Sequence, residues 1–327
     1  MASETKIEWC DSTHNPWIGC TKVSPACDHC YASVSTPVRT KGIVWGAGQP
    51  RQRTSEANWK LPVKWNRMDF GQCPGCGWRG TGILTCQADE HGSDRKCPIC
   101  IRATPDGPEY ISYLKPSRRR VFCASLADVF DNEAPIEWLV DLLDLIRRTP
   151  NLDWLLLTKR IGNWRRRLED AVWYLSGPAG KVLDILGTRR AWIASWLLGT
   201  AVPTNVWLGA TICNQQEADR DVPKLLQVPA LVRFLSIEQM LEAIRVDDIA
   251  GPGGDGVMKP LCGLWHKRSE LSGRMRPTSM SKIDWVICGG ESGPHARPMH
   301  PDWVRNVYIP GMERRLRHAE KALDRFD

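Results

Sequence analysis

The stretch VFCASLADVFDNEAPIEWLVDLLDLIRRTPNLDWLLLTKR, from Val121 to Arg160, places a helix pattern between two short apolar runs. The runs are Val121–Ala124 and Trp154–Leu157, and the helix pattern covers Ile136–Arg147. Short apolar runs that are separated by helices are typical of βα units, whose strands lie side by side in a parallel sheet. The stretch therefore predicts an α/β fold.

The same alternation continues toward the C-terminus. We expect a helix from about Asn163 and a polar helix over Gln215–Leu226. Two stretches interrupt the pattern, and we expect additional helix in one and a loop insertion in the other. The three further apolar runs are Val206–Ala210, Leu231–Leu235 and Trp285–Cys288, and the interruptions are Leu175–Thr204 and residues 251–282.

Short polar clusters follow all five apolar runs. In parallel sheets and barrels the βα loops converge at the carboxyl ends of the strands, where ligands bind. We therefore expect these side chains to line one shared pocket. In chain order the clusters are Ser125 and Asp128; Thr158, Lys159 and Arg160; Thr211, Asn214 and Gln215; Ser236 and Glu238; and Gly289, Gly290 and Glu291.

Composition restricts the class of protein. The 327 residues are 42% hydrophobic and 25% charged, which excludes a wholly disordered, collagenous or coiled-coil chain. No run of about 18 apolar residues is present, so we expect no membrane-spanning helix. The polar start of the chain, with Glu4 and Glu8, does not resemble a secretory signal, and we expect a cytoplasmic protein in a bacterial host cell. The net charge of +7 is compatible with a polyanionic partner.

Thirteen cysteines, without an export signal, point to metal binding rather than to disulfides. Cys20, Cys27 and Cys30 form a Cys-x6-Cys-x2-Cys group in a Pro- and Gly-rich loop. Three thiolates would hold an iron–sulfur cluster with one open iron, or a zinc ion with a fourth ligand; unligated buried thiols are a third interpretation. The candidate fourth ligands are His14, His29 and Cys10.

A second cysteine group has the spacing of a zinc ribbon. Cys73-x2-Cys76 and Cys97-x2-Cys100 are two knuckles separated by 20 residues (97 − 76 − 1). Four thiolates make a closed tetrahedral site, which predicts a structural Zn²⁺. The expected domains are an N-terminal strand and cluster-binding loop region over residues 1–70, a zinc-ribbon-like insert over 71–101, and the remaining βα units over 102–327.

Several motifs together resemble a phage-encoded three-Cys-motif family, whose genes often neighbour a three-Cys-motif partner protein. The resemblance covers about residues 6 to 305, and it implies such a protein as a partner. The motifs are Ile7-Glu8-Trp9, Asn15-Pro16-Trp17, residues 19–32 around the three cysteines, residues 156–160, residues 205–209, residues 234–238 and residues 284–293.

That family in turn resembles radical S-adenosylmethionine (radical SAM) enzymes. The resemblance implies a partial parallel (β/α)6-type barrel with a first strand near residues 6–9. It also implies a [4Fe-4S] cluster on the three loop cysteines, with SAM on the open iron and a 5′-deoxyadenosyl radical as the reactive species. Gly289-Gly290-Glu291 resembles the SAM-binding Gly-Gly-Glu sequence, although that sequence normally lies on an early strand. The first cysteine gap is six residues instead of three, and the C-terminal residues 312–327 form a charged helix pattern in place of an aromatic strand.

The leading hypothesis is thus a radical-SAM-like enzyme acting on a nucleic acid or nucleotide, with an unidentified electron donor. Glu238, Lys159 and Arg160 are the candidate catalytic residues, and Gly289–Glu291 are the candidate cofactor contacts. One alternative is a non-catalytic zinc protein that binds nucleic acid, with zinc at both cysteine groups. A second alternative is a degenerate family member that holds a cluster but does not cleave SAM.

Overall fold

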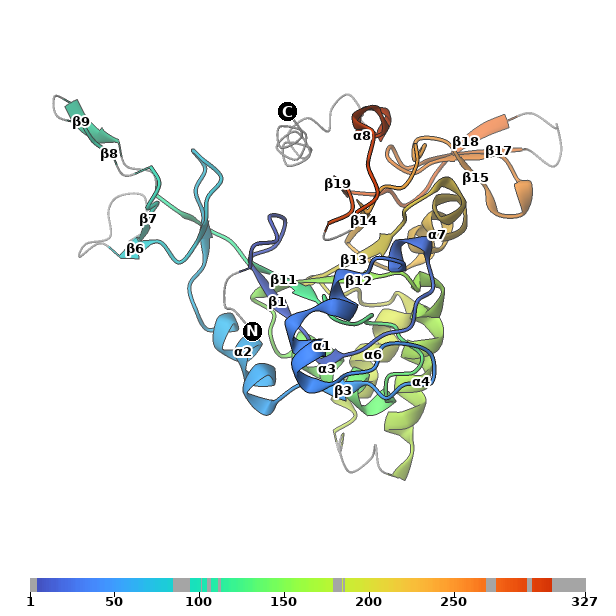
Figure 1. Ribbon diagram of the computed structural model, residues 1–327, viewed down its shortest axis with the longest axis horizontal. Helices are drawn as coiled ribbons and strands as arrows, with labels where there is room; N and C mark the ends of the chain where they lie inside the picture. Colours follow the sequence, from blue (N-terminus) through green and yellow to red (C-terminus); the bar gives the residue numbers. More distant parts are fainter. Residues whose placement is uncertain are drawn as a thin grey trace.

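A curled, fully parallel six-stranded sheet forms the centre of the computed structural model (Figure 1). The structure describes residues 5–84, 95–100, 102–104, 107–110, 113–178, 184, 186–268, 275–292 and 296–307. The strand order follows the chain order, and the sheet closes about half of a barrel. The strands are β1 (Ser12–His14), β11 (Arg119–Cys123), β12 (Leu152–Thr158), β13 (Val206–Thr211), β14 (Val232–Glu238) and β19 (Trp285–Gly289).

All five apolar runs identified in the sequence are strands of this sheet, so the predicted parallel α/β fold is confirmed. The first strand was predicted near residues 6–9, and this is wrong, because a turn lies at residues 8–9 and the strand begins at Ser12. Asp11 fixes this register: its N–H donates to the Arg120 carbonyl, and its carboxylate accepts the Arg120 N–H at 2.7 Å. Trp9 therefore lies outside the strand and packs on the concave face of the sheet.

Helices cover the convex face of the sheet. Alternate strand residues, such as Val121, Trp154 and Leu208, pack in one large core against these helices. In the first helix after β11, Leu139, Leu142 and Ile146 recur at helical spacing and are fully buried. The helices and 3-10 segments here are α3 (Ile136–Arg147), η3 (Ile161–Asn163), α4 (Trp164–Ser176), α6 (Thr188–Leu198), α7 (Gln215–Gln227) and α8 (Pro301–Val307).

The opposite, concave face is aromatic. Trp9, Phe122, Phe234 and Trp285 form a second cluster, in which the Trp9 and Phe122 ring centroids lie 4.6 Å apart. β13 carries Gly209 beside this cluster, and any side chain there would collide with the Phe234 ring. The concave face is therefore filled by large rings that fit only because their neighbour is small.

The first cysteine group lies in a long loop between β1 and α2 (Glu56–Asn66). β2 (Trp17–Ile18) pairs with β3 (Gln52–Arg53), and this pairing brings the two ends of the loop together. Between them lie η1 (Pro25–Cys27), η2 (Tyr31–Val34) and α1 (Thr36–Lys41).

Two further antiparallel units are inserted between the βα units. The four-cysteine insert projects from one side of the body (Figure 1), and its pairing extends from β4 to β10. The second unit, expected as a loop over 251–282, is instead a four-stranded antiparallel sheet. The strands of the first are β4 (Gly71–Gln72), β5 (Arg79–Gly80), β6 (Ile83–Leu84), β7 (Arg95–Lys96), β8 (Arg102–Thr104), β9 (Gly107–Tyr110) and β10 (Lys115–Pro116). The second contains β15 (Ile249–Ala250), η4 (Pro252–Gly254), β16 (Val257–Lys259), β17 (Leu264–Arg268) and β18 (Met275–Ser279).

None of the helices in the described residues is long and apolar enough to cross a bilayer. The charged helix pattern over 312–327 lies outside the described residues.

Candidate functional site

A cleft of about 630 Å³ opens at the carboxyl ends of the parallel strands. This volume lies within the range of small-molecule and cofactor sites. Most of the predicted strand-end residues and the three loop cysteines lie in this one cleft, but Arg160, Asn214 and Gln215 do not line it, and the last two begin α7 instead. The lining includes Cys20, Cys27, Cys30, Ser125, Asp128, Thr158, Lys159, Thr211, Ser236, Glu238, Gly289, Gly290 and Glu291, together with Trp9, Tyr31, Trp45, Phe122 and Trp285.

The three loop cysteines approach the cleft from different parts of the loop. Cys20 follows β2, Cys27 ends η1, and Cys30 is the N-cap of η2. Their sulfurs do not all lie within 4.8 Å of one another. Burial raises the pKa of Cys20 to about 12, and Asp128 and Asp131 add to the shift. In the absence of a metal ion this thiol is therefore protonated, and metal binding would release its proton.

None of the three candidate fourth ligands lines the cleft. His14 is fully buried in the core, edge-on to Trp59 and Trp154, with ring centroids 5.7 and 5.6 Å away. Burial lowers the pKa of His14 to about 3. His29 is exposed, and Cys10 packs in the aromatic cluster of the concave face. The cysteines are thus not joined by a fourth side chain from this set.

A buried arginine network holds the Cys20 side of the loop. Arg51 Nε lies 2.7 Å from Asp131 Oδ2, and both side chains are completely buried. Arg51 also donates to the Thr21 hydroxyl at 2.8 Å, and that hydroxyl donates to Glu133. Arg160, a predicted catalytic residue, belongs to this network and does not line the cleft. Its Nη2 donates to the Thr21 carbonyl at 2.8 Å, and its Nη1 lies 3.7 Å from Asp131.

A second arginine holds the Cys27 side of the loop. Arg297 donates from Nε and Nη2 to the two oxygens of Glu291, at 3.0 and 2.8 Å. The same guanidinium donates to the Pro25 carbonyl at 3.0 Å and lies 3.4 Å from Asp28. The pKa of Glu291 is lowered, chiefly by its hydrogen bonds from Arg297. The predicted cofactor-binding carboxylate is therefore already paired, and it links the last strand to the cysteine loop.

Glu238 is a half-buried carboxyl group of the cleft. It ends β14, and its Oε2 accepts the indole N–H of Trp9 at 3.2 Å. Burial raises the pKa of Glu238; the Trp9 hydrogen bond and the charge of Lys159 act in the opposite direction. A carboxyl group in such surroundings can hold a proton at a pH where an exposed glutamate has lost it.

Asp128 connects the ends of two neighbouring strands. It accepts hydrogen bonds from the Thr158 hydroxyl at 2.6 Å and from the backbone N–H of Lys159 at 2.9 Å. Burial raises its pKa, while these bonds lower it. Asp128 therefore shapes the wall of the cleft on the side of Lys159.

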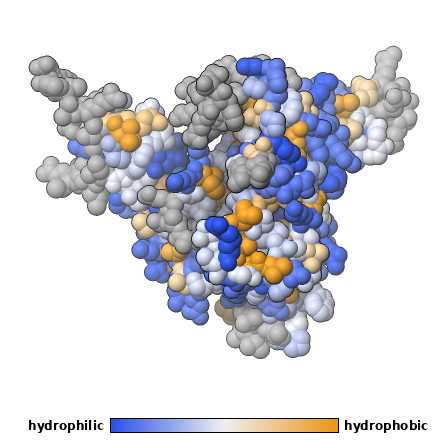
Figure 2. Space-filling model, in the orientation of Figure 1, coloured by the Kyte–Doolittle hydropathy of each residue, from blue (hydrophilic) through white to orange (hydrophobic). Residues whose placement is uncertain are grey.

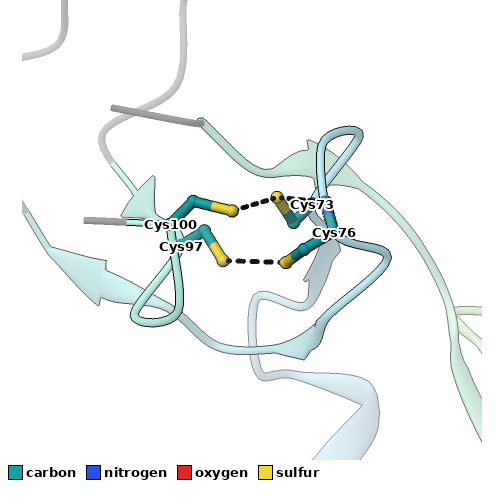
Figure 3. A group of neighbouring side chains, drawn as sticks. All are labelled: Cys73, Cys76, Cys97 and Cys100. Carbon is teal, nitrogen blue, oxygen red and sulfur yellow. Dashed lines mark hydrogen bonds between the residues drawn. The ribbon is translucent and has the colours of Figure 1, made fainter. Parts of the chain in front are cut away.

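The second cysteine group forms a compact set of ligands (Figure 3). The Cys73 and Cys100 sulfurs lie 3.7 Å apart, and those of Cys76 and Cys97 lie 3.6 Å apart. The ligand atoms of all four lie within 4.8 Å of one another, and no other such group of three or more is found in the described part of the chain. These four cysteines could hold a metal ion. Cys86, between the knuckles, lies outside the described residues.

Arg79 attaches the four-cysteine insert to the sheet. Its guanidinium donates to both carboxylate oxygens of Asp11, at 3.0 to 3.2 Å, and to the Arg118 carbonyl. Because Asp11 precedes β1, the insert is anchored next to the first strand of the sheet.

Arg51, Asp131 and Arg297 were not identified from the sequence. None of them belongs to a motif. The Arg51–Asp131 bond joins residues 80 positions apart, and the Arg297–Pro25 bond joins residues 272 positions apart. The only signal was the position of Asp131 close behind a strand end.

A family model described as "Protein of unknown function (DUF5131)" matches residues 4–315. No curated protein and no solved structure matches the chain. The matched residues contain all six strands, the cleft and both cysteine groups. The chain therefore belongs to the DUF5131 family, whose function is unknown.

Proposed function

We propose that this protein is a radical-SAM-like enzyme whose cleft holds a [4Fe-4S] cluster on Cys20, Cys27 and Cys30. The observation that carries the proposal is that these three cysteines, from the loop after the first strand, line the same cleft as the carboxyl ends of the parallel strands. That arrangement brings thiolate ligands and substrate-sized space together in a half-barrel.

The chemistry of the donor set fits a cluster better than a single zinc ion. A tetrahedral Zn²⁺ with four bonds of about 2.3 Å needs its sulfurs about 3.8 Å apart. The second cysteine group meets that requirement and the first does not. In a cluster each thiolate binds a different iron atom, so more widely spaced sulfurs are appropriate. With three cysteines, and none of His14, His29 and Cys10 lining the cleft, one iron would remain open to it.

When bound, the cluster and SAM would supply a 5′-deoxyadenosyl radical for hydrogen abstraction. The aromatic faces of Trp9, Phe122 and Trp285, together with the carboxyl group of Glu238, suit a molecule that carries a sulfonium cation and a flat base. Lys159 lines the same cleft and would pair with a carboxylate.

The strand-end residues of this chain would orient the cofactor and keep water out. A Cβ at Gly289 would lie 3.0 Å from Glu238 Cγ, so the glycine leaves the glutamate room. Glu238 would face the ligand from the end of β14. Glu291 and Arg160 act through the cysteine loop, and in this proposal they are positioning residues.

For the second group we propose a structural Zn²⁺ in a zinc-ribbon-like insert, because its sulfur spacing of 3.6 and 3.7 Å equals that of a tetrahedral site. The resemblance to the phage three-Cys-motif family, its partner protein, the cytoplasmic location and a nucleic acid or nucleotide substrate remain proposals. The net charge of +7 supports the last of them.

Metal analysis of anaerobically purified and reconstituted protein tests the proposal. We expect about four irons and about one zinc per chain. Cys27→Ala should lose the iron and keep the zinc, whereas Cys262→Ala, at an exposed cysteine outside both groups, should keep both. Full iron loading in Cys27→Ala would refute the assignment.

Two other outcomes support the alternatives. About two zinc ions and no iron would indicate the non-catalytic zinc protein. Iron without 5′-deoxyadenosine, after addition of SAM and dithionite, would indicate a cluster-binding member that does not cleave SAM.

A further inference from the structure

Gln239 lines the cleft with an amide oxygen that lacks a partner. The residue directly follows Glu238, which ends β14. Its Oε1 is buried, and no described residue donates a hydrogen bond to it. A buried carbonyl oxygen without a donor opposes folding, so a native protein keeps one only where another role requires it. In a cleft of ligand size, the role that fits this position is hydrogen bonding to a ligand.

The backbone that follows Gln239 is fixed on two sides. The Met240 N–H donates to the Gly289 carbonyl at 3.0 Å, and the Leu241 N–H donates to the Cys213 carbonyl at 3.0 Å. These bonds tie the segment to the last residue of β19 and to the residues that follow β13. Gln239 is therefore held by the sheet, as a residue that selects a ligand must be.

Two hydroxyl groups line the same cleft on neighbouring strands. Thr211 of β13 and Ser236 of β14 are partners in the parallel register. Ser236 lies two residues before Glu238, and residues two apart on a strand share a face. Hydroxyl and amide groups both donate and accept hydrogen bonds. This side of the cleft therefore suits a ligand whose edge carries donors beside acceptors.

Charge restricts which part of a ligand can enter. Among the described residues that line the cleft, carboxyl groups outnumber lysines by four to two. Such a lining repels a phosphate but not a neutral group. The ligand group that reaches Gln239 is therefore neutral. The carboxyl groups are those of Glu8, Asp128, Glu238 and Glu291, and the lysines are Lys6 and Lys159.

The cleft also offers rings to a flat ligand. Five aromatic side chains line it, so rings remain for a second flat group beside the adenine of the proposed cofactor. On the face that Figure 2 presents, hydrophobic residues form only small areas among hydrophilic ones. A second flat group would therefore find its stacking partners in the cleft rather than on this face. The five rings are those of Trp9, Tyr31, Trp45, Phe122 and Trp285.

We infer that the cleft takes up one nucleobase of the substrate and that Gln239 binds the polar edge of this base. A nucleobase is neutral, has two flat faces that stack on rings, and carries donors beside acceptors at its edge. Enzymes that act on a base move it out of the stack into a pocket and read that edge. The phosphates stay outside, where the net charge of +7 attracts them. The inference rests on the proposed function for the reaction of the base, but not for its binding.

Single-stranded DNA that carries one base tests the site. The probes are labelled strands that are abasic except for one central adenine, guanine, cytosine or thymine, and a fully abasic strand measures binding by the backbone alone. We expect the full chain to bind at least one base-carrying strand about tenfold more tightly than the abasic strand. Equal binding of all five strands would overturn the inference.

Competition by the matching free nucleoside identifies the source of the base. A nucleoside that binds more weakly than the strand indicates a nucleic acid substrate, and one that binds equally well indicates a free nucleotide. Either result supports the base site.

Gln239→Met tests the role of the amide, because methionine keeps the length of the side chain and removes its hydrogen-bonding groups. Binding of the preferred strand should fall about tenfold, and binding of the abasic strand should not change. Resistance to denaturant should be unchanged or higher, because an unpaired buried oxygen is removed. Gln216→Met, at an exposed position of α7, should match the wild type in both measurements. A loss of stability in Gln239→Met, or unchanged base binding, would contradict the assignment.

Two further measurements separate this inference from the proposed function. In iron-loaded protein, Gln239→Met should bind SAM like the wild type, and weaker SAM binding would place the amide against the cofactor and refute the base site. Iron loading with SAM cleavage, but without preference for a base-carrying strand, would refute the base site and leave the proposed function standing. Protein without iron would refute the proposed function, and the strand comparison would still decide whether the cleft binds a base.

Discussion

The two cysteine groups of this protein are held in opposite ways. The four sulfurs of the insert lie close together, with pairs 3.6 and 3.7 Å apart, but in the described residues only a small apolar core surrounds them. Its core consists of Leu114 and Trp78 beside the cysteines themselves. The three sulfurs of the cleft lie farther apart, yet their loop is fixed by buried arginines, by the β2–β3 pairing and by its own apolar core.

The difference indicates whether the metal ion or the protein orders each cysteine group. In the insert the metal ion would do what a hydrophobic core does elsewhere, as expected for a unit with few buried side chains. In the cleft the protein prepares the site before any cofactor arrives. Removing the metal ligands should therefore unfold the insert but leave the cleft loop in place.

The largest effect is expected from Cys97→Ser. Loss of one thiolate opens the tetrahedral site, and structural zinc in comparable small units is worth about 10–16 kcal/mol. We expect zinc to fall to about zero per chain and limited proteolysis to cut within residues 71–117, while the sheet still unfolds cooperatively. Cys262→Ser, at an exposed cysteine, is the control. An insert that resists protease as the wild type does would remove the contrast between the two groups.

The next largest effect is expected from Arg51→Ala. Removal of one partner of a buried ion pair leaves Asp131 with only the more distant Arg160, which costs about 3–5 kcal/mol. Denaturant unfolding measures this loss, and proteolysis within residues 19–50 reports on the loop. Arg165→Ala removes a pair with Glu169 in which both side chains are more than half exposed, and it should cost at most about 1 kcal/mol. If the two variants lose the same stability, the arginine network does not hold the loop.

The smallest effect is expected from His14→Phe. This variant tests whether His14 is a metal ligand together with Cys20, Cys27 and Cys30. Neither ring nitrogen has a hydrogen-bond partner among the described residues, and burial holds the pKa near 3 instead of 6.5. The unfolded chain binds the proton first as the pH falls, so wild-type stability should decrease by about 1.4 kcal/mol per pH unit below about pH 6.5.

In His14→Phe that contribution is absent. Between pH 7 and pH 5 the variant should lose about 2 kcal/mol less stability than the wild type. Iron loading should remain unchanged, because His14 does not line the cleft. Loss of iron in this variant would make His14 a ligand and would remove the open position of the first group.

Much of the fold could be predicted because its signals are local. Each of the five apolar runs overlaps one strand, three lying wholly inside it, and the helix over Ile136–Arg147 has the predicted bounds. The exception is the first strand. The apolar residues near Trp9 line the cleft, whereas Ser12–His14 pairs with β11 although it contains no apolar run. The sheet within 251–282 was not predicted because its strands, such as β18, are short and exposed. Such strands are defined by pairing with a neighbouring strand and not by an apolar run.

The candidate site was predicted in its composition but not in its internal contacts. Strand-end residues converge because of topology, so Lys159 and Glu238 could be placed in one pocket from the pattern alone. The contacts of Arg160 with Thr21 and Asp131 could not be predicted, since they depend on how the loop folds back. The same holds for Glu291, whose carboxylate is taken by Arg297.

By itself, the sequence determined the parallel sheet and the two cysteine groups, because strand periodicity and ligand spacing are properties of neighbouring residues. The tertiary structure decided which side chains remain available in the cleft. Trp9 binds Glu238 across 229 residues, and Arg297 reaches Pro25 across 272. Contacts of such separation depend on the closure of the half-barrel, which no local pattern encodes.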